Sequence, residues 1–216
     1  MVYALIDKMD KLSINDIWDL REYERRRDDY RSWIIARKHN RRVSIGDFIT
    51  VVFENRDTVK FQIQEMVRAE RMIRDDKVQA ELDAYNPLIP EENELSATLF
   101  LEFSDEAPMR EWLPKLVGIE TAVQLHIGDR VALCRPEQEH ADMLTRSDVT
   151  SSVHYIRFSL DTQDVATLRE SRALRESGAA SAVVLAVDHP AYKASTLLTG
   201  ETVEELLGDL EYSRHS

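Results

Sequence analysis

The strongest periodic pattern in this chain lies between Asp57 and Asp75, where apolar residues recur at the spacing of one helix face. The positions that share this face are Val59, Ile63, Met66, Val67 and Ile73. Glu70 falls near the centre of the same arc. Because a buried carboxylate without a partner is costly, the pattern predicts that Glu70 is ion-paired, protonated or bound to a cation.

The neighbours of Glu70 leave two interpretations open. Arg74 follows four residues later, in the favourable order for an ion pair along a helix, and Lys77 is also within reach. In that case Glu70 is a structural residue. Otherwise it is a functional carboxylate, either a metal ligand or an acid–base group with a pKa shifted by burial.

Composition and charge narrow the class of protein. A net charge of −12 over 216 residues argues against a nucleic-acid binder, because phosphate contacts need an excess of Lys and Arg. The single cysteine, Cys134, excludes an internal disulfide framework and a Cys-based zinc or iron–sulfur site within one chain. No apolar run approaches the roughly 20 residues that span a bilayer, and Met1 does not open a secretory signal. We therefore expect a cytoplasmic protein that is not embedded in a membrane.

The charge is distributed unevenly along the chain. Residues 1–42 hold eleven Lys and Arg against eight Asp and Glu, whereas the remainder is strongly acidic. We expect a basic N-terminal helical arm over 1–42 and an α+β domain over 43–216. The basic residues either form the solvated cationic end of a helix, or dock the arm onto an acidic partner or the protein's own acidic body.

Strand and helix signals alternate after the first helix, which should begin at Ser13 and reach about Lys38. Residues 48–54 fit a strand better than a helix, because they are rich in β-branched side chains and follow a Gly46-Asp47 turn. Further strands are expected over 95–103, 123–134 (a hairpin), 153–160 and 182–187, with helices over 109–117, 161–178 and 202–210 and a polar loop over 135–150. This order predicts the α+β class, with a mixed or antiparallel sheet, packed helices and a long N-terminal helix.

Two other places could carry chemistry. His154 shares a strand face with apolar residues, so it is either a satisfied core histidine or, if it approaches Glu70, part of a site for iron, manganese or zinc. Asp188 and His189 end a buried strand, where they either stabilise a turn or act at a site. The sequence contains no glycine-rich phosphate loop, H-E-x-x-H helix or G-x-S-x-G elbow, so no motif identifies a reaction.

Five stretches of the chain resemble the bacterial DUF3501 family, which is defined only as a domain of unknown function: Phe53–Glu70, Glu81–Pro90, Glu94–Thr98, Val153–Phe158 and Asp188–Tyr192. Beside Glu70, His154, Asp188 and His189, the resemblance brings in further candidate site residues, namely Glu54, Arg56, Gln62, Glu65, Arg68 and Tyr85. It also implies a supporting role in peroxide defence or electron transfer, with a rubrerythrin-like protein or an iron–sulfur oxidoreductase as partner.

These observations lead to three hypotheses of function. The first is a cytoplasmic accessory protein of a redox or oxidative-stress system that binds a partner protein and a divalent metal near Glu70 and His154. The second is a small-molecule hydrolase or transferase in which Glu70 or Glu65 works as a general base with His154. The third is a structural adaptor without a bound metal, and a homo-oligomer is compatible with each of them.

Overall fold

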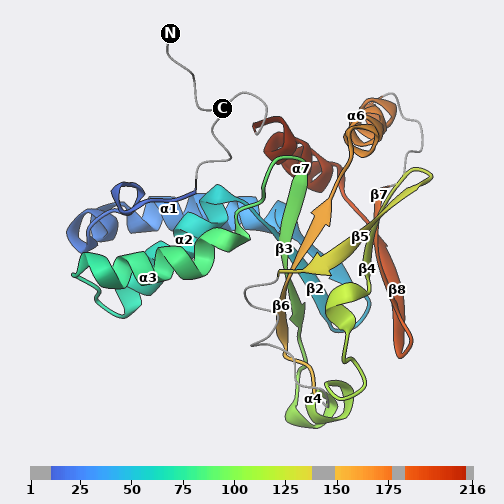
Figure 1. Cartoon of the computed structure of the whole chain (residues 1–216), viewed down its shortest axis with the longest axis horizontal. Coiled ribbons are helices and arrows are strands. Elements are labelled where there is room, and N and C mark those ends of the chain that lie inside the picture. The colour runs from blue at the N-terminus through green and yellow to red at the C-terminus, as the bar shows by residue number, and fades with distance from the viewer. Residues whose placement is uncertain (1–10, 138–148, 177–182, 213–216) are drawn as a thin grey trace.

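The fold is organised around an antiparallel sheet. The computed structural model describes residues 11–137, 149–176 and 183–212, and in this part of the chain eight strands pair in the order β1-β2-β3-β6-β5-β4-β7-β8 (Figure 1). The strands are β1 (Arg42–Ile45), β2 (Ile49–Glu54), β3 (Glu94–Leu101), β4 (Val123–Ile127), β5 (Arg130–Pro136), β6 (Val153–Ser159), β7 (Val183–His189) and β8 (Tyr192–Leu197). The predicted α+β class is confirmed, and the sheet is antiparallel rather than mixed.

The sheet curls until its two edge strands meet through side chains. Thr196 Oγ1 of β8 donates to the Ser44 carbonyl of β1 over 2.6 Å, and the Tyr192 hydroxyl donates to the Ile45 carbonyl over 3.2 Å. The turn at Gly46 allows this approach, because a Cβ there would lie only 2.0 Å from the Tyr192 hydroxyl oxygen. Gly46 also has a φ of +66°, which favours glycine. The predicted turn and the strand predicted over 48–54 are therefore both present.

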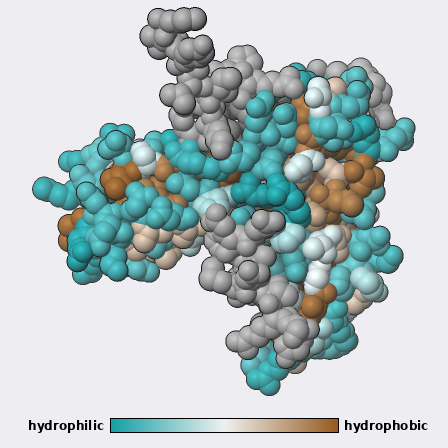
Figure 2. Space-filling model, in the orientation of Figure 1, coloured by the Kyte–Doolittle hydropathy of each residue, from teal (hydrophilic) through white to brown (hydrophobic). Residues whose placement is uncertain are grey.

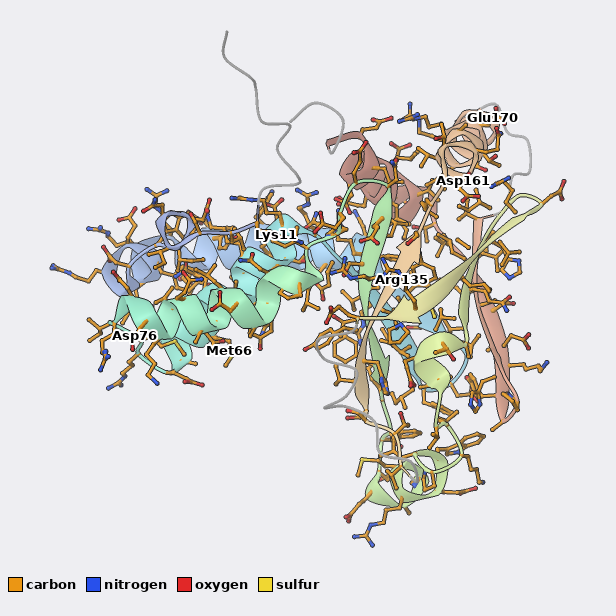
Figure 3. The ribbon with its side chains drawn as sticks, viewed as in Figure 1. Lys11, Met66, Asp76, Arg135, Asp161 and Glu170 are labelled. Atoms are coloured by element: carbon orange, nitrogen blue, oxygen red, sulfur yellow. The ribbon has the colours of Figure 1, made fainter. Side chains whose placement is uncertain are left out.

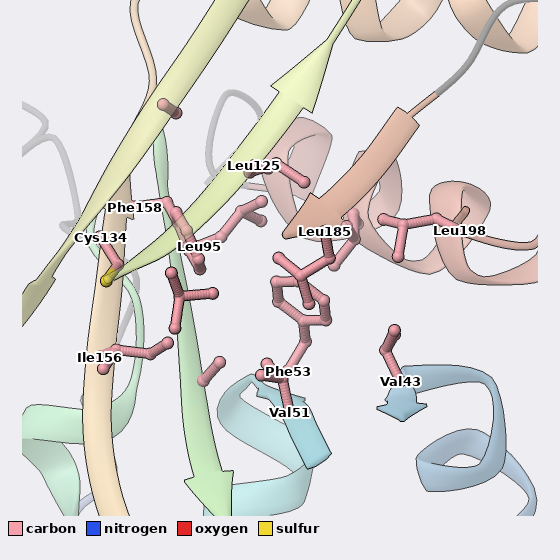
Figure 4. Close-up of a cluster of buried hydrophobic side chains, with 14 of the residues drawn as sticks. Val43, Val51, Phe53, Leu95, Leu125, Cys134, Ile156, Phe158, Leu185 and Leu198 are labelled. Atoms are coloured by element: carbon pink, nitrogen blue, oxygen red, sulfur yellow. The ribbon is translucent and has the colours of Figure 1, made fainter. Parts of the chain in front are cut away.

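The main apolar core fills the inside of the curled sheet (Figure 4). Alternate residues of the strands face inward, so that Phe53 of β2, Leu99 of β3 and Phe158 of β6 are almost fully buried. Two helices complete this core at one end, α6 (Thr162–Glu176) and α7 (Gly200–Tyr212). The opposite end is filled by residues after α4 (Glu106–Trp112) and from the 3-10 turn η3 (Ile119–Thr121).

The outer face of β2, β3 and β6 is covered by the helical layer, which projects to one side of the sheet in Figure 1. This layer consists of η1 (Ile14–Asp16), α1 (Leu20–Arg41), α2 (Arg56–Ala69), α3 (Asp75–Tyr85) and η2 (Asn86–Leu88). A second apolar cluster, separate from the main core, holds it together around Ile63 and Leu82. None of the helices in the described residues is long and apolar enough to cross a membrane.

Several element boundaries differ from the predicted ones. The N-terminal helix does not begin at Ser13, whose interaction with Asp16 caps only a short 3-10 turn. The long helix α1 begins after Asp19, which accepts hydrogen bonds from the first turn of backbone amides, and continues to Arg41. Strand β8 was not expected, because its apolar residues alternate with polar ones in too short a run. Residues 138–148 of the predicted loop lie outside the described residues.

Candidate functional site

The prediction that Glu70 is buried on a helix face is wrong. Helix α2 ends at Ala69, and Arg71 then adopts a φ of +51°, so the chain turns away before the apolar arc is complete. Glu70 is exposed at this end, and Ile73, expected on the same face, is 85% exposed. The charge of Glu70 acts on Glu81, whose pKa is raised by burial and then by this neighbouring carboxylate. Glu70 therefore has no need of a buried cation.

His154 is a buried core histidine, as one of the two interpretations held, but it does not approach Glu70. Its ring points into the sheet interior, with Nε2 2.9 Å from the Ser151 carbonyl and 2.9 Å from Thr150 Oγ1. Nδ1 lies 4.0 Å from Glu120 Oε2. Burial lowers the pKa of His154, and the charge of Glu120 opposes this effect. Since Glu70 belongs to the helical layer outside the sheet, the proposed Glu70–His154 metal site does not assemble.

The described residues contain no cluster of three or more His, Cys, Asp or Glu side chains placed to hold a metal ion. In Figure 3, Met66 and Asp76, which bracket Glu70 in the sequence, lie on the helical layer and away from Arg135 on the sheet. Cys134 is buried, and burial raises the pKa of its thiol to about 12, so it stays protonated at neutral pH. Its Sγ donates to the Glu120 carbonyl over 3.2 Å.

Asp188 and His189 stabilise the hairpin between β7 and β8. Asp188 is exposed and pairs with Lys193 across the strands at 2.6 Å, which lowers the pKa of Asp188. His189 Nδ1 accepts the backbone N–H of Ala191 over 3.2 Å, and its Nε2 lies 3.1 Å from the Val117 carbonyl. Of these two residues, the histidine is the one that accepts the hydrogen bond within the turn.

Three residues that entered through the family resemblance attach the N-terminal helices to α2. Glu65 accepts two hydrogen bonds from Arg27 and one from Tyr23. Arg56 pairs with Asp16 at 2.6 Å, and Arg68 pairs with Glu24 at 2.7 Å. These side chains are engaged in structural contacts, so Glu65 is not available as a general base.

The basic end of α1 contacts the acidic helix α7. Arg41 is fully buried and donates to Asp209 over 2.7 Å and to Glu205 over 2.7 Å. Burial opposes the charge of Arg41, but the two carboxylates outweigh it and raise its pKa. Arg37 reaches Glu205 as well, at 3.0 Å. Docking onto the protein's own acidic body, one of the two interpretations left open, is thus present, whereas a domain boundary at residue 42 stays a prediction.

The remaining candidates, Glu54, Gln62 and Tyr85, meet at a hollow of about 170 Å³ between the helical layer and the sheet. We call this hollow the Glu54 cavity. Its lining is Lys38 of α1, Val59 and Gln62 of α2, Tyr85, Leu88, and the outward residues Glu54, Thr98, Phe100, Val153 and Tyr155 of β2, β3 and β6. Residues distant in sequence, but singled out by one family resemblance, thus share one site.

Local geometry explains how the strands place the carboxylate. Glu54 is the last residue of β2, and Asn55 follows it as the N-cap of α2, accepting the backbone N–H groups of Asp57 and Thr58. Thr98 lies on the adjacent strand and donates its hydroxyl to Glu54 Oε1 over 2.8 Å. The strand end and the helix start therefore fix Glu54 at the cavity.

The cavity combines one buried carboxylate with several hydrogen-bond donors. Glu54 is only 9% exposed, and Thr98 is its hydrogen-bond partner within the described residues. The side chains of Lys38, Gln62 and Tyr85 make no hydrogen bond or ion pair with any other described residue. Burial, then the neighbouring Tyr85 and Glu54, raise the pKa of Tyr155, so its phenol stays protonated. The site offers hydrogen-bond donors, the negative charge of Glu54 and the positive charge of Lys38.

Sequence reasoning missed Lys38, Thr98 and Tyr155 as site residues. Thr98 and Tyr155 are paired neighbours on adjacent strands, and both occupy the strand face opposite the apolar one. That alternation was visible in the sequence, but it predicted a solvent-facing surface rather than a second covered face. Lys38 was visible only as part of a basic cluster.

The comparisons with known proteins agree with the family resemblance. Residues 11–210 match the sequence model of the family described as "Protein of unknown function (DUF3501)". A crystal structure of a novel protein of unknown function from Burkholderia pseudomallei K96243 is similar to this chain, with 32% sequence identity and a TM-score of 0.82. The similarity covers 93% of this chain and 100% of that chain. The comparison with curated proteins gives no significant match.

Proposed function

This chain belongs to the DUF3501 family, and from that premise we propose that it is an accessory binding protein that holds a small polar molecule in the Glu54 cavity. One observation carries the proposal. Glu54 is nine-tenths buried and opens onto a cavity, while the described residues give its carboxylate a single hydroxyl partner and no ion pair. A buried carboxylate is stabilised by an opposite charge, which a ligand can bring.

The lining indicates the chemistry of the ligand. A cationic group would be attracted by Glu54, whereas Lys38, Gln62 and Tyr85 can donate to an oxygen acceptor on the same molecule. The volume of about 170 Å³ is close to that of an engineered protein cavity of roughly 150 Å³ that binds benzene. A zwitterion of the size of a small amino acid has both groups and fits this space.

The same lining favours binding over proton transfer. Tyr155 has a raised pKa and therefore acts as a donor rather than as a base at neutral pH. The alternative of a Glu/His enzyme has little support, because Glu65 is held by Arg27 and His154 points into the other side of the sheet. The adaptor hypothesis differs from the present one in predicting an empty cavity.

The redox setting of the proposal comes from the family resemblance. We propose that the protein is a cytoplasmic accessory protein and that its partner is a rubrerythrin-like protein or an iron–sulfur oxidoreductase. The molecule bound in the cavity would act in that redox system. Calorimetric titration of the purified protein with each partner tests this part separately. A role for iron, manganese or zinc is tested by elemental analysis of untagged protein, and such a metal would need ligands other than the pair Glu70 and His154.

The ligand proposal is tested by thermal unfolding in the presence of amino acids, small diamines and hydroxy acids. Saturation at about 100 times Kd stabilises a protein by roughly 2.7 kcal/mol, which for a chain of this size raises Tm by about 5 to 10 °C. We expect zwitterions to give this shift, and Glu54→Gln and Lys38→Met to remove it.

The matched control is Glu70→Gln, which makes the same chemical change on an exposed carboxylate outside the cavity. It should leave the ligand-induced shift intact. If no compound raises Tm, or if Glu54→Gln responds as the unmodified protein does, the cavity is not a ligand site and the adaptor hypothesis gains.

A further inference from the structure

A second hollow lies at the end of the helical layer that is farther from the sheet. It has a volume of about 490 Å³, much larger than the Glu54 cavity, and an apolar lining. One wall comes from η1 and the start of α1, with Ile14, Ile17 and Leu20. The other comes from the end of α2 and the connection to α3, with Val67, Met72 and Ile73. We call this hollow the Ile73 groove.

The rim of the groove exposes a large apolar side chain. Ile73 is 85% exposed, whereas Val67 and Val78 nearby are buried. Figure 2 shows hydrophobic surface among the otherwise hydrophilic residues of the helical layer. The connection that carries Ile73 includes Arg71 in a left-handed conformation, with a φ of +51°, which is unfavourable for a residue other than glycine. The chain thus presents Ile73 to solvent at a conformational cost.

Some charged residues around the groove already have a structural role, and others do not. Asp19 caps α1, and Asp75 lies in the first turn of α3, where the helix dipole favours a negative charge. Arg21 in the groove lining and Arg71 beside it are exposed, and neither makes an ion pair with a described residue. In contrast, Arg68 of the same helical layer is paired with a carboxylate. The charge of Arg21 acts on Asp19, but among the described residues no carboxylate lies within ion-pair distance of either guanidinium group.

We propose that the Ile73 groove docks a short segment of a partner protein that carries bulky apolar side chains flanked by acidic residues. The hollow receives the apolar side chains, and burial of Ile73 on docking removes its contact with water. Carboxylates of the partner pair with Arg21 and Arg71, which make no ion pair within the described part of the chain. This surface is distinct from the Glu54 cavity, so the inference holds whether or not the cavity binds a ligand.

The test is selection of displayed random peptides on the immobilised full-length protein, followed by Kd measurement with fluorescent peptides. We expect enrichment of peptides that combine two bulky apolar residues with Asp or Glu. Ile73→Ser should weaken their binding by about tenfold or more, because it removes a large apolar contact. Arg21→Glu should also weaken it, and affinity should fall as salt concentration rises.

The matched control is Leu133→Ser on β5, which removes another exposed apolar side chain, 63% exposed, far from the groove. It should leave peptide affinity unchanged. The proposal is overturned if no peptide family is enriched, if the enriched peptides are basic, or if Ile73→Ser binds them as tightly as the unmodified protein. A concentration-dependent dimer that Ile73→Ser abolishes would assign the groove to a second copy of the chain and overturn the proposal as well.

Discussion

The interior of the sheet and the helical layer beside it are held together by different chemistry. Inside the sheet, large apolar side chains such as Phe53, Leu99 and Phe158 fill the space. The helical layer has a smaller apolar cluster around Ile63 and Leu82, and charged hydrogen bonds such as that from Arg27 to Glu65 join its helices as well. Apolar packing is not directional, whereas hydrogen bonds fix individual groups. The first region specifies the fold, and the second fixes how the helices sit on it.

This difference also decides where ligands can bind. Both hollows, the Glu54 cavity and the Ile73 groove, border the helical layer. The helical layer leaves one polar and one apolar hollow at its edges, whereas the large side chains inside the sheet pack closely against one another. The scaffold is therefore the sheet interior, and the candidate functions belong to the layer beside it.

The largest expected effect comes from breaking the sheet interior. Phe158→Ala removes a fully buried ring next to Phe53, and we expect a loss of about 4 kcal/mol in the free energy of unfolding, measured with urea. The same substitution at Phe61, a half-buried residue of α2, should cost less than half as much. Equal losses at both positions would mean that the helical layer is as tightly packed as the core.

A somewhat smaller effect is expected from the junction of the two regions. Arg41→Met keeps much of the side-chain volume but leaves Asp209 and Glu205 without their buried cation, which should cost about 3 kcal/mol. The matched control is Arg74→Met, at an arginine that is 77% exposed and paired with Asp76. This control should change stability by less than about 0.5 kcal/mol. If the two substitutions have the same effect, the network at Arg41 does not stabilise the junction.

Much of the fold could be predicted from the sequence, because its cues are local. The turn at Gly46 and the hairpin at Gly128 follow from residues that tolerate positive φ, and both are present. The strand face of Leu95, Leu99 and their neighbours follows from alternation. The order of the strands in the sheet does not follow from local cues, since it depends on contacts between distant segments.

The candidate site was less predictable, for two physical reasons. The spacing of apolar residues does not show where a helix ends. The predicted apolar face was therefore extended through Glu70 to Ile73, although α2 ends at Ala69. In addition, the alternation of apolar and polar residues over 95–103 suggested a strand with one face in water, whereas nearly every residue of β3 is buried. Glu54 therefore became a candidate only through family resemblance.

Acidification should weaken the helical layer through Glu65. The hydrogen bonds from Arg27 lower the pKa of Glu65 below the ordinary value of 4.5. Burial raises this pKa, but the hydrogen bond from Tyr23 lowers it further. A depressed folded-state pKa means that the stabilisation is complete above the unfolded pKa and is lost as pH falls through the folded one. Glu65→Gln should cost about 1 to 2 kcal/mol at neutral pH, and its stability should fall less steeply below about pH 4.5. Urea unfolding at a series of pH values gives both quantities, and parallel curves for the two proteins would contradict this role.

The smallest expected change in stability comes from a substitution at Ile73, which we compare with the same substitution at Ile63. Ile63 and Ile73 belong to the same apolar period in the sequence, yet Ile63 is fully buried and Ile73 is 85% exposed. Ile73→Ser should change the free energy of unfolding by less than about 0.5 kcal/mol, because the side chain already lies in water. Ile63→Ser should cost several times more, since it leaves a void and a hydroxyl in the apolar cluster of the helical layer. Urea unfolding of both variants decides the matter. If Ile73→Ser is strongly destabilising, then the groove is part of the folded interior and its exposed isoleucine stabilises the chain rather than a complex.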